Sequence, residues 1–245
     1  MINNSDFTIG QKIRWLSLFI RTPMDNRFHN LVAAIFGVLN KSDPVVLDIG
    51  ANVGHFVKAC LAQNNKPSRI IAVEPSAIVF PILNFWTKTI WRKKTEITTH
   101  KVAFGNRDDH VTLKTPIKES GSLRVGLASI GNFDKIKVFS EDVIMTTIDN
   151  FLTTKGVTKV DLVKMDVEGA ENMVLSGADE LFYNIRPVWY LELDNSRAAM
   201  FGENIKTIFD KFVGNGYFAY VFVDEQKIQK VTTLNDKKDY LFIPK

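Results

Sequence analysis

The sequence contains one cysteine, Cys60, in 245 residues. A single cysteine can neither close a disulfide within the chain nor build a cysteine-based zinc site. Its apolar helical surroundings favour core packing over a reactive thiol. No segment reaches the ~18 apolar residues that a membrane span needs, and no basic region precedes an apolar run with a cleavage site. We therefore expect a soluble, cytoplasmic protein.

The sequence also has little excess of charge of either sign, and it has no histidines at metal-ligand spacing. The net charge is only +4, which could favour an anionic substrate, a phosphate-bearing carrier or a membrane surface, but an ordinary, slightly basic surface is the simpler interpretation. No basic run is interleaved with aromatic residues, so no nucleic-acid partner is expected. The four histidines are scattered and no pair has metal-ligand spacing, so no histidine-based metal site is predicted.

What is present from residue 45 onward is an alternation of short apolar strands and helices, which predicts a parallel sheet with right-handed crossovers. We expect a helical segment over 1–43 and one α/β domain over 44–245. Glycines and short alternating runs predict a β insertion or lid around 104–146. The expected strands cover 45–49, 69–73, a third strand that ends near 102–103, 160–165, 188–193, 217–223 and 240–243, the last two forming an antiparallel edge. The expected helices cover 56–63, 77–87, 170–182 and 205–213.

The first 43 residues contain two apolar helical stretches, separated by Pro23. Ile9, Ile13, Leu16 and Ile20 recur at helical spacing, with Lys12, Arg14 and Arg21 between them, and a second stretch covers 28–39. Either stretch could lie on a membrane surface. Such stripes more often pack on a domain core, and that is the expectation here.

The strongest motif is Asp48-Ile49-Gly50-Ala51-Asn52-Val53-Gly54, between an expected strand and a helix. Its glycines allow a tight turn and close approach to a ligand. The acid two residues before the first glycine would repel the pyrophosphate that a dinucleotide fold binds. S-Adenosylmethionine carries a sulfonium and an ammonium instead, both of which attract a carboxylate. Glu74 ends the next strand, where a carboxylate can bind ribose hydroxyls.

A second motif, Lys164-Met165-Asp166-Val167-Glu168-Gly169-Ala170-Glu171, follows the fourth expected strand. Residues 164, 166 and 168 would point the same way in an extended chain. We expect them to converge at the carboxyl end of the sheet, where open α/β sheets bind ligands. The alternative is that Lys164 reaches solvent and pairs with an acid. Glu192, at the end of the fifth strand, is either a third site carboxylate or a solvated strand end.

These blocks, with Thr147-Ile148-Asp149, Val174-Leu175-Ser176-Gly177-Ala178 and Arg186-Pro187, resemble FkbM-type methyltransferases over roughly residues 45–193. The resemblance implies a class I, Rossmann-like α/β fold: a mostly parallel seven-stranded sheet, an antiparallel last strand and helices on both faces. It also implies S-adenosylmethionine as methyl donor and a hydroxyl acceptor on a sugar, glycoconjugate or secondary metabolite. The candidate cofactor-binding residues are Asp48, Gly50, Ala51, Asn52, Gly54, His55, Glu74, Ala103 and Asp166. Among these, His55 stands where such families often have an aromatic, and Ala103 would lie near the adenine.

The candidate catalytic residues are Asp166, Glu168 and Lys164. Either carboxylate could take the acceptor proton as general base, or both could hold a Mg²⁺-like ion, which the residues allow but do not require. Lys164 could stabilise the alkoxide or orient Asp166. A nicotinamide-dependent oxidoreductase and a cofactor-binding scaffold without turnover are the competing hypotheses. The acceptor's identity and the oligomeric state stay open.

The walls of the acceptor pocket are expected from the 104–146 insertion, the segment after Glu192 and the N-terminal helices. Phe133, Trp189 and Phe201 could stack on a sugar or an aromatic ring, although aromatic side chains are more often core.

Overall fold

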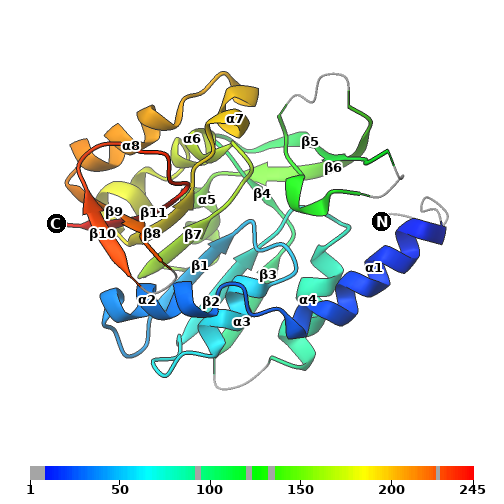
Figure 1. Cartoon of the computed structure of the whole chain (residues 1–245), viewed down its shortest axis with the longest axis horizontal. Helices are drawn as coiled ribbons and strands as arrows, with labels where there is room; N and C mark the ends of the chain where they lie inside the picture. The colour runs from blue at the N-terminus through cyan, green and yellow to red at the C-terminus, as the bar shows by residue number, and fades with distance from the viewer. Residues whose placement is uncertain (1–8, 92–94, 120–122, 132–135, 225–226) are drawn as a thin grey trace.

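The computed structural model describes residues 9–91, 95–119, 123–131, 136–224 and 227–245. Its centre is a twisted sheet with helices on both faces (Figure 1). The strands of this sheet are β1 (Val45–Ile49), β2 (Arg69–Val73), β3 (Glu96–His100), β7 (Leu162–Met165), β8 (Val188–Glu192), β9 (Tyr217–Phe222), β10 (Ile228–Val231) and β11 (Asp239–Pro244).

The strand order is β10-β9-β11-β8-β7-β1-β2-β3. The strands from β3 to β8 pair in parallel, and β11 runs antiparallel to both of its neighbours, β8 and β9. This confirms the mostly parallel sheet with an antiparallel last strand.

Two details of the sheet differ from expectation. The described part of the chain has eight strands in this sheet rather than seven, because the charged stretch between the last two expected strands contains β10, which pairs with β9. The final strand lies inside the sheet instead of at an edge, because β11 inserts between β8 and β9. Only the β9–β10 pairing joins segments that follow each other along the chain, whereas β11 pairs with β8 and β9 across intervening chain. Alternation of apolar residues alone did not reveal either arrangement.

Helices of both N- and C-terminal parts cover the sheet. The α-helices are α1 (Ile9–Arg21), α2 (His29–Leu39), α3 (His55–Leu61), α4 (Phe80–Thr89), α5 (Ile148–Thr154), α6 (Glu171–Leu175), α7 (Asn195–Ala198) and α8 (Ile205–Gly214). Short 3₁₀ segments are η2 (Thr22–Met24), η3 (Val125–Leu127) and η5 (Ala199–Phe201), and η4 (Glu180–Ile185) is a π-helix.

Two apolar cores lie on opposite faces of the sheet. Leu47 and Ile49 of β1 point to the face covered by α5, α6 and α8, whereas Val46 points to the face covered by α2 and α3. This is the two-residue period of a strand. Because both faces are covered, the central strands are apolar almost throughout, and Asp48 and Lys164 are polar exceptions.

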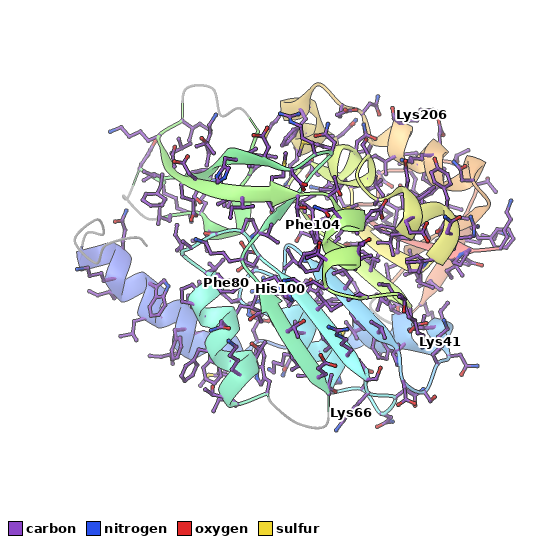
Figure 2. The ribbon with its side chains drawn as sticks, turned by 180° about the vertical axis from the view of Figure 1, so that it is seen from behind. Lys41, Lys66, Phe80, His100, Phe104 and Lys206 are labelled. Atoms are coloured by element: carbon purple, nitrogen blue, oxygen red, sulfur yellow. The ribbon has the colours of Figure 1, made fainter. Side chains whose placement is uncertain are left out.

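The segment predicted as a β insertion holds a second sheet, ordered β4-β6-β5. Its strands are β4 (Ala103–Phe104), β5 (Asp109–Pro116) and β6 (Val138–Thr146). The third central strand ends at His100, earlier than predicted, because Ala103 and Phe104 pair with β6 instead. Figure 2 shows His100 and Phe104 where the chain passes between the two sheets, and both rings contact Phe151, at centroid distances of 4.9 and 5.2 Å.

The helix predicted over 170–182 is interrupted. The chain leaves α6 after Leu175 and resumes as η4 at Glu180. At Gly177 an added Cβ would lie 2.2 Å from the Gly105 carbonyl oxygen. Close packing on the start of the β insertion thus requires glycine there, and glycine weakens a continuous helix.

The N-terminal stripe expected to pack on the core does not. Ile13, Leu16 and Ile20 are exposed, and it is Trp15, Leu18 and Phe19 that pack on the domain. The helical period identified one apolar face of α1, but the domain covers a different face, which the sequence analysis did not single out. The second stretch, α2, does bury its apolar residues. Among the described residues, no helix is both long and apolar enough to cross a membrane.

Candidate active site

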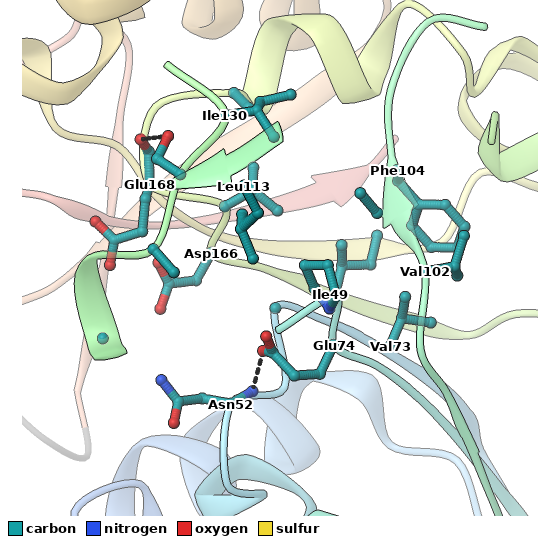
Figure 3. Close-up of a pocket in the computed structure, with 18 of the residues that line it drawn as sticks. Ile49, Asn52, Val73, Glu74, Val102, Phe104, Leu113, Ile130, Asp166 and Glu168 are labelled. Carbon is teal, nitrogen blue, oxygen red and sulfur yellow. Dashed lines mark hydrogen bonds between the residues drawn. The ribbon is translucent and has the colours of Figure 1, made fainter. Parts of the chain in front are cut away.

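A pocket opens at the carboxyl ends of β1, β2 and β7, beneath the second sheet (Figure 3). About 660 Å³ of space between its walls, open solvent included, is free of protein atoms. Its walls are formed by Ile49, Gly50, Asn52, Val73, Glu74, Pro75, Val102, Ala103, Phe104, Leu113, Val125, Gly126, Ala128, Ser129, Ile130, Asp166, Val167, Glu168 and Ala170.

The loop after β1 has a backbone that its sequence dictates. Gly50 has φ +70°, and an added Cβ would lie 1.9 Å from the Asp166 carbonyl oxygen. Asn52 is also left-handed, at φ 50°, and Gly54 has φ +95° with Leu83 and Trp91 against it. A side chain at Gly50 would therefore push β1 away from the loop after β7, and one at Gly54 would collide with Leu83 and Trp91. Close backbone approach explains the spacing of the motif.

Glu74 is held at the floor of the pocket. Its Oε2 accepts a hydrogen bond from the Asn52 backbone N–H at 2.8 Å, and its Oε1 accepts one from the Ser76 N–H at 2.9 Å. Figure 3 shows the first of these bonds. Burial raises the pKa of this carboxyl to about 7, although both backbone bonds favour the charged form. A ligand that donated hydrogen bonds to the carboxylate would compensate the cost of burying it.

Asp48 and Lys164 form a buried ion pair below the loop. They are register partners on adjacent strands, and the Lys164 Nζ lies 3.3 Å from the Asp48 Oδ1. The same Nζ donates to the Gly50 carbonyl oxygen at 2.6 Å. Burial raises the pKa of Asp48, although the positive charge of Lys164 opposes this rise. Burial alone would lower the pKa of Lys164, but the negative charges of Asp48 and Asp166 outweigh it and raise that pKa. Neither residue lines the pocket, and Lys164 does not reach solvent.

Asp166 and Glu168 both line the pocket, as the second motif predicted. The Asp166 Oδ2 lies 3.9 Å from the Lys164 Nζ, and its Oδ1 is buried and accepts no hydrogen bond within the described structure. Glu168 has φ 57°, and its Oε2 lies 2.7 Å from the Arg197 Nη1. Burial and then the charge of Asp166 raise the pKa of Glu168 to about 8, against the opposing effect of Arg197. Of the three residues expected to converge, two face the pocket and Lys164 lies behind them.

Arg197 was not found by sequence reasoning. It contacts Glu168, and its Nη1 also lies 3.2 Å from the Glu192 Oε1. Its helix α7 is capped by Asp194, whose side chain accepts hydrogen bonds from the backbone N–H groups of residues 196 and 197. An added Cβ at Gly169 would lie 2.4 Å from the Arg197 carbonyl oxygen, so Gly169 lets α7 approach. In the sequence, Arg197 is marked only by its position shortly after a strand that ends in Glu192. Many surface arginines follow strands in the same way, so this position does not predict a site residue.

Ser129 is a second residue that the motifs did not reveal. It is buried in the pocket wall, and its hydroxyl donates to the Glu168 carbonyl oxygen at 3.2 Å. The β insertion is thereby joined to the loop after β7. Nothing in the local sequence of Ser129 distinguishes it from other loop serines.

The remaining predicted residues are dispersed. Ala103 lines the pocket, but Ala51, Gly54 and His55 do not. The His55 Nε2 lies 3.7 Å from the Asp25 Oδ2, and burial lowers its pKa to about 4.

The three aromatic candidates have different positions. Trp189 is fully buried, with its ring 5.8 Å from that of Phe212, so it cannot stack on a ligand. Phe201 is half-buried and lies against Gly131. Phe133 lies outside the described residues.

Electrostatics give the pocket one sign. Its only charged lining residues in the described structure are Glu74, Asp166 and Glu168. No group of three or more His, Cys, Asp or Glu side chains in the described ranges could hold a metal ion. The one predicted pair of metal-binding carboxylates includes Glu168, whose carboxylate is already paired with Arg197.

The strand order, the antiparallel β11 and a ligand pocket at the carboxyl ends of the parallel strands define a class I, Rossmann-like methyltransferase fold. Residues 48–219 match the family model "Methyltransferase FkbM domain". The chain belongs to this family of methyltransferases.

Individual relatives are distant. The chain is 24% identical over 193 residues to "2-O-methyltransferase NoeI" of Sinorhizobium fredii, a match that covers 74% of this chain and 76% of the relative. It resembles the structure of methyltransferase FkbM from Methylobacillus flagellatus at a TM-score of 0.52 and 15% identity, over 95% of this chain. It spans only 60% of the length of that solved chain. A putative RNA methyltransferase from Pyrococcus horikoshii aligns at a TM-score of 0.41 and 14% identity, over 89% of this chain and 84% of that one.

Proposed function

We propose that this protein transfers a methyl group from S-adenosylmethionine to a hydroxyl oxygen. One observation carries the choice of cofactor: the charged groups that line the pocket are all carboxyls. A carboxyl-lined, partly enclosed site attracts a sulfonium and an ammonium and repels a pyrophosphate. The same observation disfavours a nicotinamide dinucleotide, since the lining offers its phosphates no basic side chain among the described residues.

The residues present fit this cofactor. The Glu74 carboxylate would accept hydrogen bonds from the two ribose hydroxyls, and the glycine-bearing loop at Gly50 leaves room for the ligand against the backbone. Val102, Ala103 and Phe104 form an apolar wall suited to the adenine. When bound, the cofactor supplies a methyl group on a positively charged sulfur.

Asp48 supports the site indirectly. Its charge holds Lys164, which in turn donates to the Gly50 carbonyl oxygen and fixes the loop. Because Asp48 is fully buried and paired, its replacement would disturb the loop as well as any ligand contact. Glu74 is therefore a sharper test of cofactor binding than Asp48.

The acceptor hydroxyl must lose a proton as its oxygen attacks. We assign that proton to Asp166, because its side chain lines the pocket and is not engaged by an arginine as that of Glu168 is. Glu168 is already engaged by Arg197 and has a pKa near 8, so much of it is protonated at neutral pH. Its role is to shape the acceptor side of the pocket. Positioned bases of this kind contribute roughly 100-fold or more to rate.

The family and one relative support the proposed class of acceptor. The name of the Sinorhizobium protein specifies 2-O-methylation. This favours a hydroxyl on a saccharide, a glycoconjugate or a comparable small metabolite as the partner, with no nucleic acid involved. A cytoplasmic location stays a prediction.

Calorimetric titration tests the cofactor first. S-Adenosylmethionine and its demethylated product should bind the wild type, and Glu74→Gln should weaken both by at least ~10-fold, because the amide nitrogen cannot accept a hydroxyl hydrogen bond and the remaining oxygen carries no charge. Asp166→Asn should keep that affinity and lose roughly 100-fold or more in turnover with hydroxylated acceptors. Binding of a nicotinamide dinucleotide, with no heat from either adenosyl compound, would refute the proposal.

A further inference from the structure

Helix α1 has two apolar faces, and its inner face fixes it to the domain. Trp15, Leu18 and Phe19 pack on the cluster that contains Ile78 and Ile82. The Trp15 Nε1 donates to the Ile78 carbonyl oxygen at 2.7 Å. The inner face is therefore already occupied, and α1 is held in place independently of its outer surface.

The outer face of α1 is apolar as well. Ile13, Leu16 and Ile20 are 65%, 53% and 52% exposed, and their spacing of three and four residues places them on one stripe. Phe85 of α4 extends the apolar surface: it is 42% exposed, and its ring centroid lies 4.9 Å from that of Phe19. Figures 1 and 2 show α1 and α4 side by side at the periphery of the molecule. Single exposed apolar residues are common, but a continuous stripe indicates a binding surface.

The charge around this stripe has one sign. Lys12 and Arg21 are exposed and flank the stripe on α1, and Lys88 lies on α4 three residues from Phe85. Ranges 9–21 and 80–91 contain four basic residues and no acidic residue. The two helices that carry the apolar surface are therefore locally basic.

We propose that the outer face of α1 docks the protein on an anionic lipid bilayer. Ile13, Leu16 and Ile20 would enter the boundary between headgroups and acyl chains, with Lys12 and Arg21 against the headgroups. An apolar stripe bordered by basic residues is the pattern of helices that lie in a membrane interface. A second copy of the chain fits less well, because a two-fold contact would bring the basic residues of both α1 helices together.

The docking helix α1 is also connected to the pocket wall by side-chain packing. Val125, which lines the pocket, packs on the same cluster as Trp15 and Leu18. The helix and the wall of the β insertion are thus parts of one packed unit.

Co-sedimentation with vesicles tests the proposal. Wild-type protein should partition at least ~10-fold more strongly into phosphatidylcholine vesicles with about 30% phosphatidylglycerol than into pure phosphatidylcholine. Ile13→Ser/Ile20→Ser should reduce that partitioning at least ~10-fold, since membrane binding scales with the apolar area inserted. Lys12→Gln/Arg21→Gln should lower it by a similar factor and weaken its dependence on salt.

Two matched controls distinguish docking through α1 from non-specific adsorption to the vesicles. Tyr183→Ser/Val223→Ser removes exposed apolar groups away from α1, and Lys66→Gln/Lys237→Gln removes exposed charge elsewhere; both should bind as the wild type does. A second readout uses Leu16→Cys with a polarity-sensitive dye, because Cys60 is buried and should not react. The dye should shift to the blue on anionic vesicles, whereas the same dye on Val223→Cys should not.

Several outcomes would overturn the proposal. Wild-type protein that stays in the supernatant with anionic vesicles would do so, as would an Ile13→Ser/Ile20→Ser variant that is folded and binds undiminished. A wild-type dimer in light scattering that this variant converts to monomer would make the stripe an interface between copies instead.

Discussion

The buried carboxyl of Glu74 should make the stability of this protein fall as pH rises. Its pKa is raised from 4.5 to about 7 in the folded chain, so the folded state binds the proton more tightly than the unfolded state does. The group therefore favours folding when protonated, and this contribution is lost as pH rises from 4.5 through 7. This rise in the pKa corresponds to about 3 kcal/mol in the free energy of unfolding. Most of it, about 2.5 kcal/mol, should be lost between about pH 5 and pH 8.

Urea unfolding of wild type and Glu74→Gln across this pH range measures the effect. Glutamine is isosteric and does not titrate, and other buried carboxyls, such as Glu171 with a pKa of about 7, contribute equally to both proteins. The wild-type minus variant difference in unfolding free energy should therefore decrease by about 2.5 kcal/mol from about pH 5 to pH 8. A difference that does not change with pH would refute the reasoning. It would mean that water in the pocket solvates this carboxylate and keeps its pKa near the ordinary value.

Three further substitutions test the site's architecture. Gly50→Ala should cost at least ~3 kcal/mol of unfolding free energy, because its Cβ would lie 1.9 Å from a backbone oxygen, whereas Gly156→Ala, at φ +62° in open space, should cost only ~1–2 kcal/mol in urea denaturation. Lys164→Met should cost roughly 3–5 kcal/mol by leaving a buried carboxylate unpaired, and Asp48→Asn/Lys164→Met should recover much of that loss; no recovery would contradict the ion-pair argument. Arg197→Met removes the positive neighbour of Glu168, so the pKa of Glu168 should rise above about 8 in a carbon-13 NMR titration. An unchanged pKa would show that the contact between the two side chains is weak.

Much of the site was predictable because the residue types in the sequence indicate the local backbone conformation. Gly50 and Gly54 mark turns with positive φ, and Glu74 comes at the end of the adjacent parallel strand. Parallel strands bring their carboxyl ends to one edge, so motifs far apart in sequence were expected to meet there. Asp166 and Glu168 did arrive in that pocket.

The partners of these residues were not predictable. Lys164 sits opposite Asp48 because of strand register, and the two are separated by more than a hundred residues. Arg197 reaches Glu168 because α7 approaches closely over Gly169. Spacing in the sequence shows which residues share a strand or a turn, but not which side chain of another element occupies the space in front of them.

By itself, the sequence determined the alternation of strands and helices, the glycine turns and the acids at the strand ends, since each follows from local periodicity and backbone sterics. Tertiary structure alone decided that Asp48 serves Lys164 rather than lining the pocket, and that the stripe of Ile13, Leu16 and Ile20 faces outward. The physical reason is the same in both cases. An apolar or charged side chain can be satisfied by several neighbours, and only the packing of whole elements determines which neighbour it has.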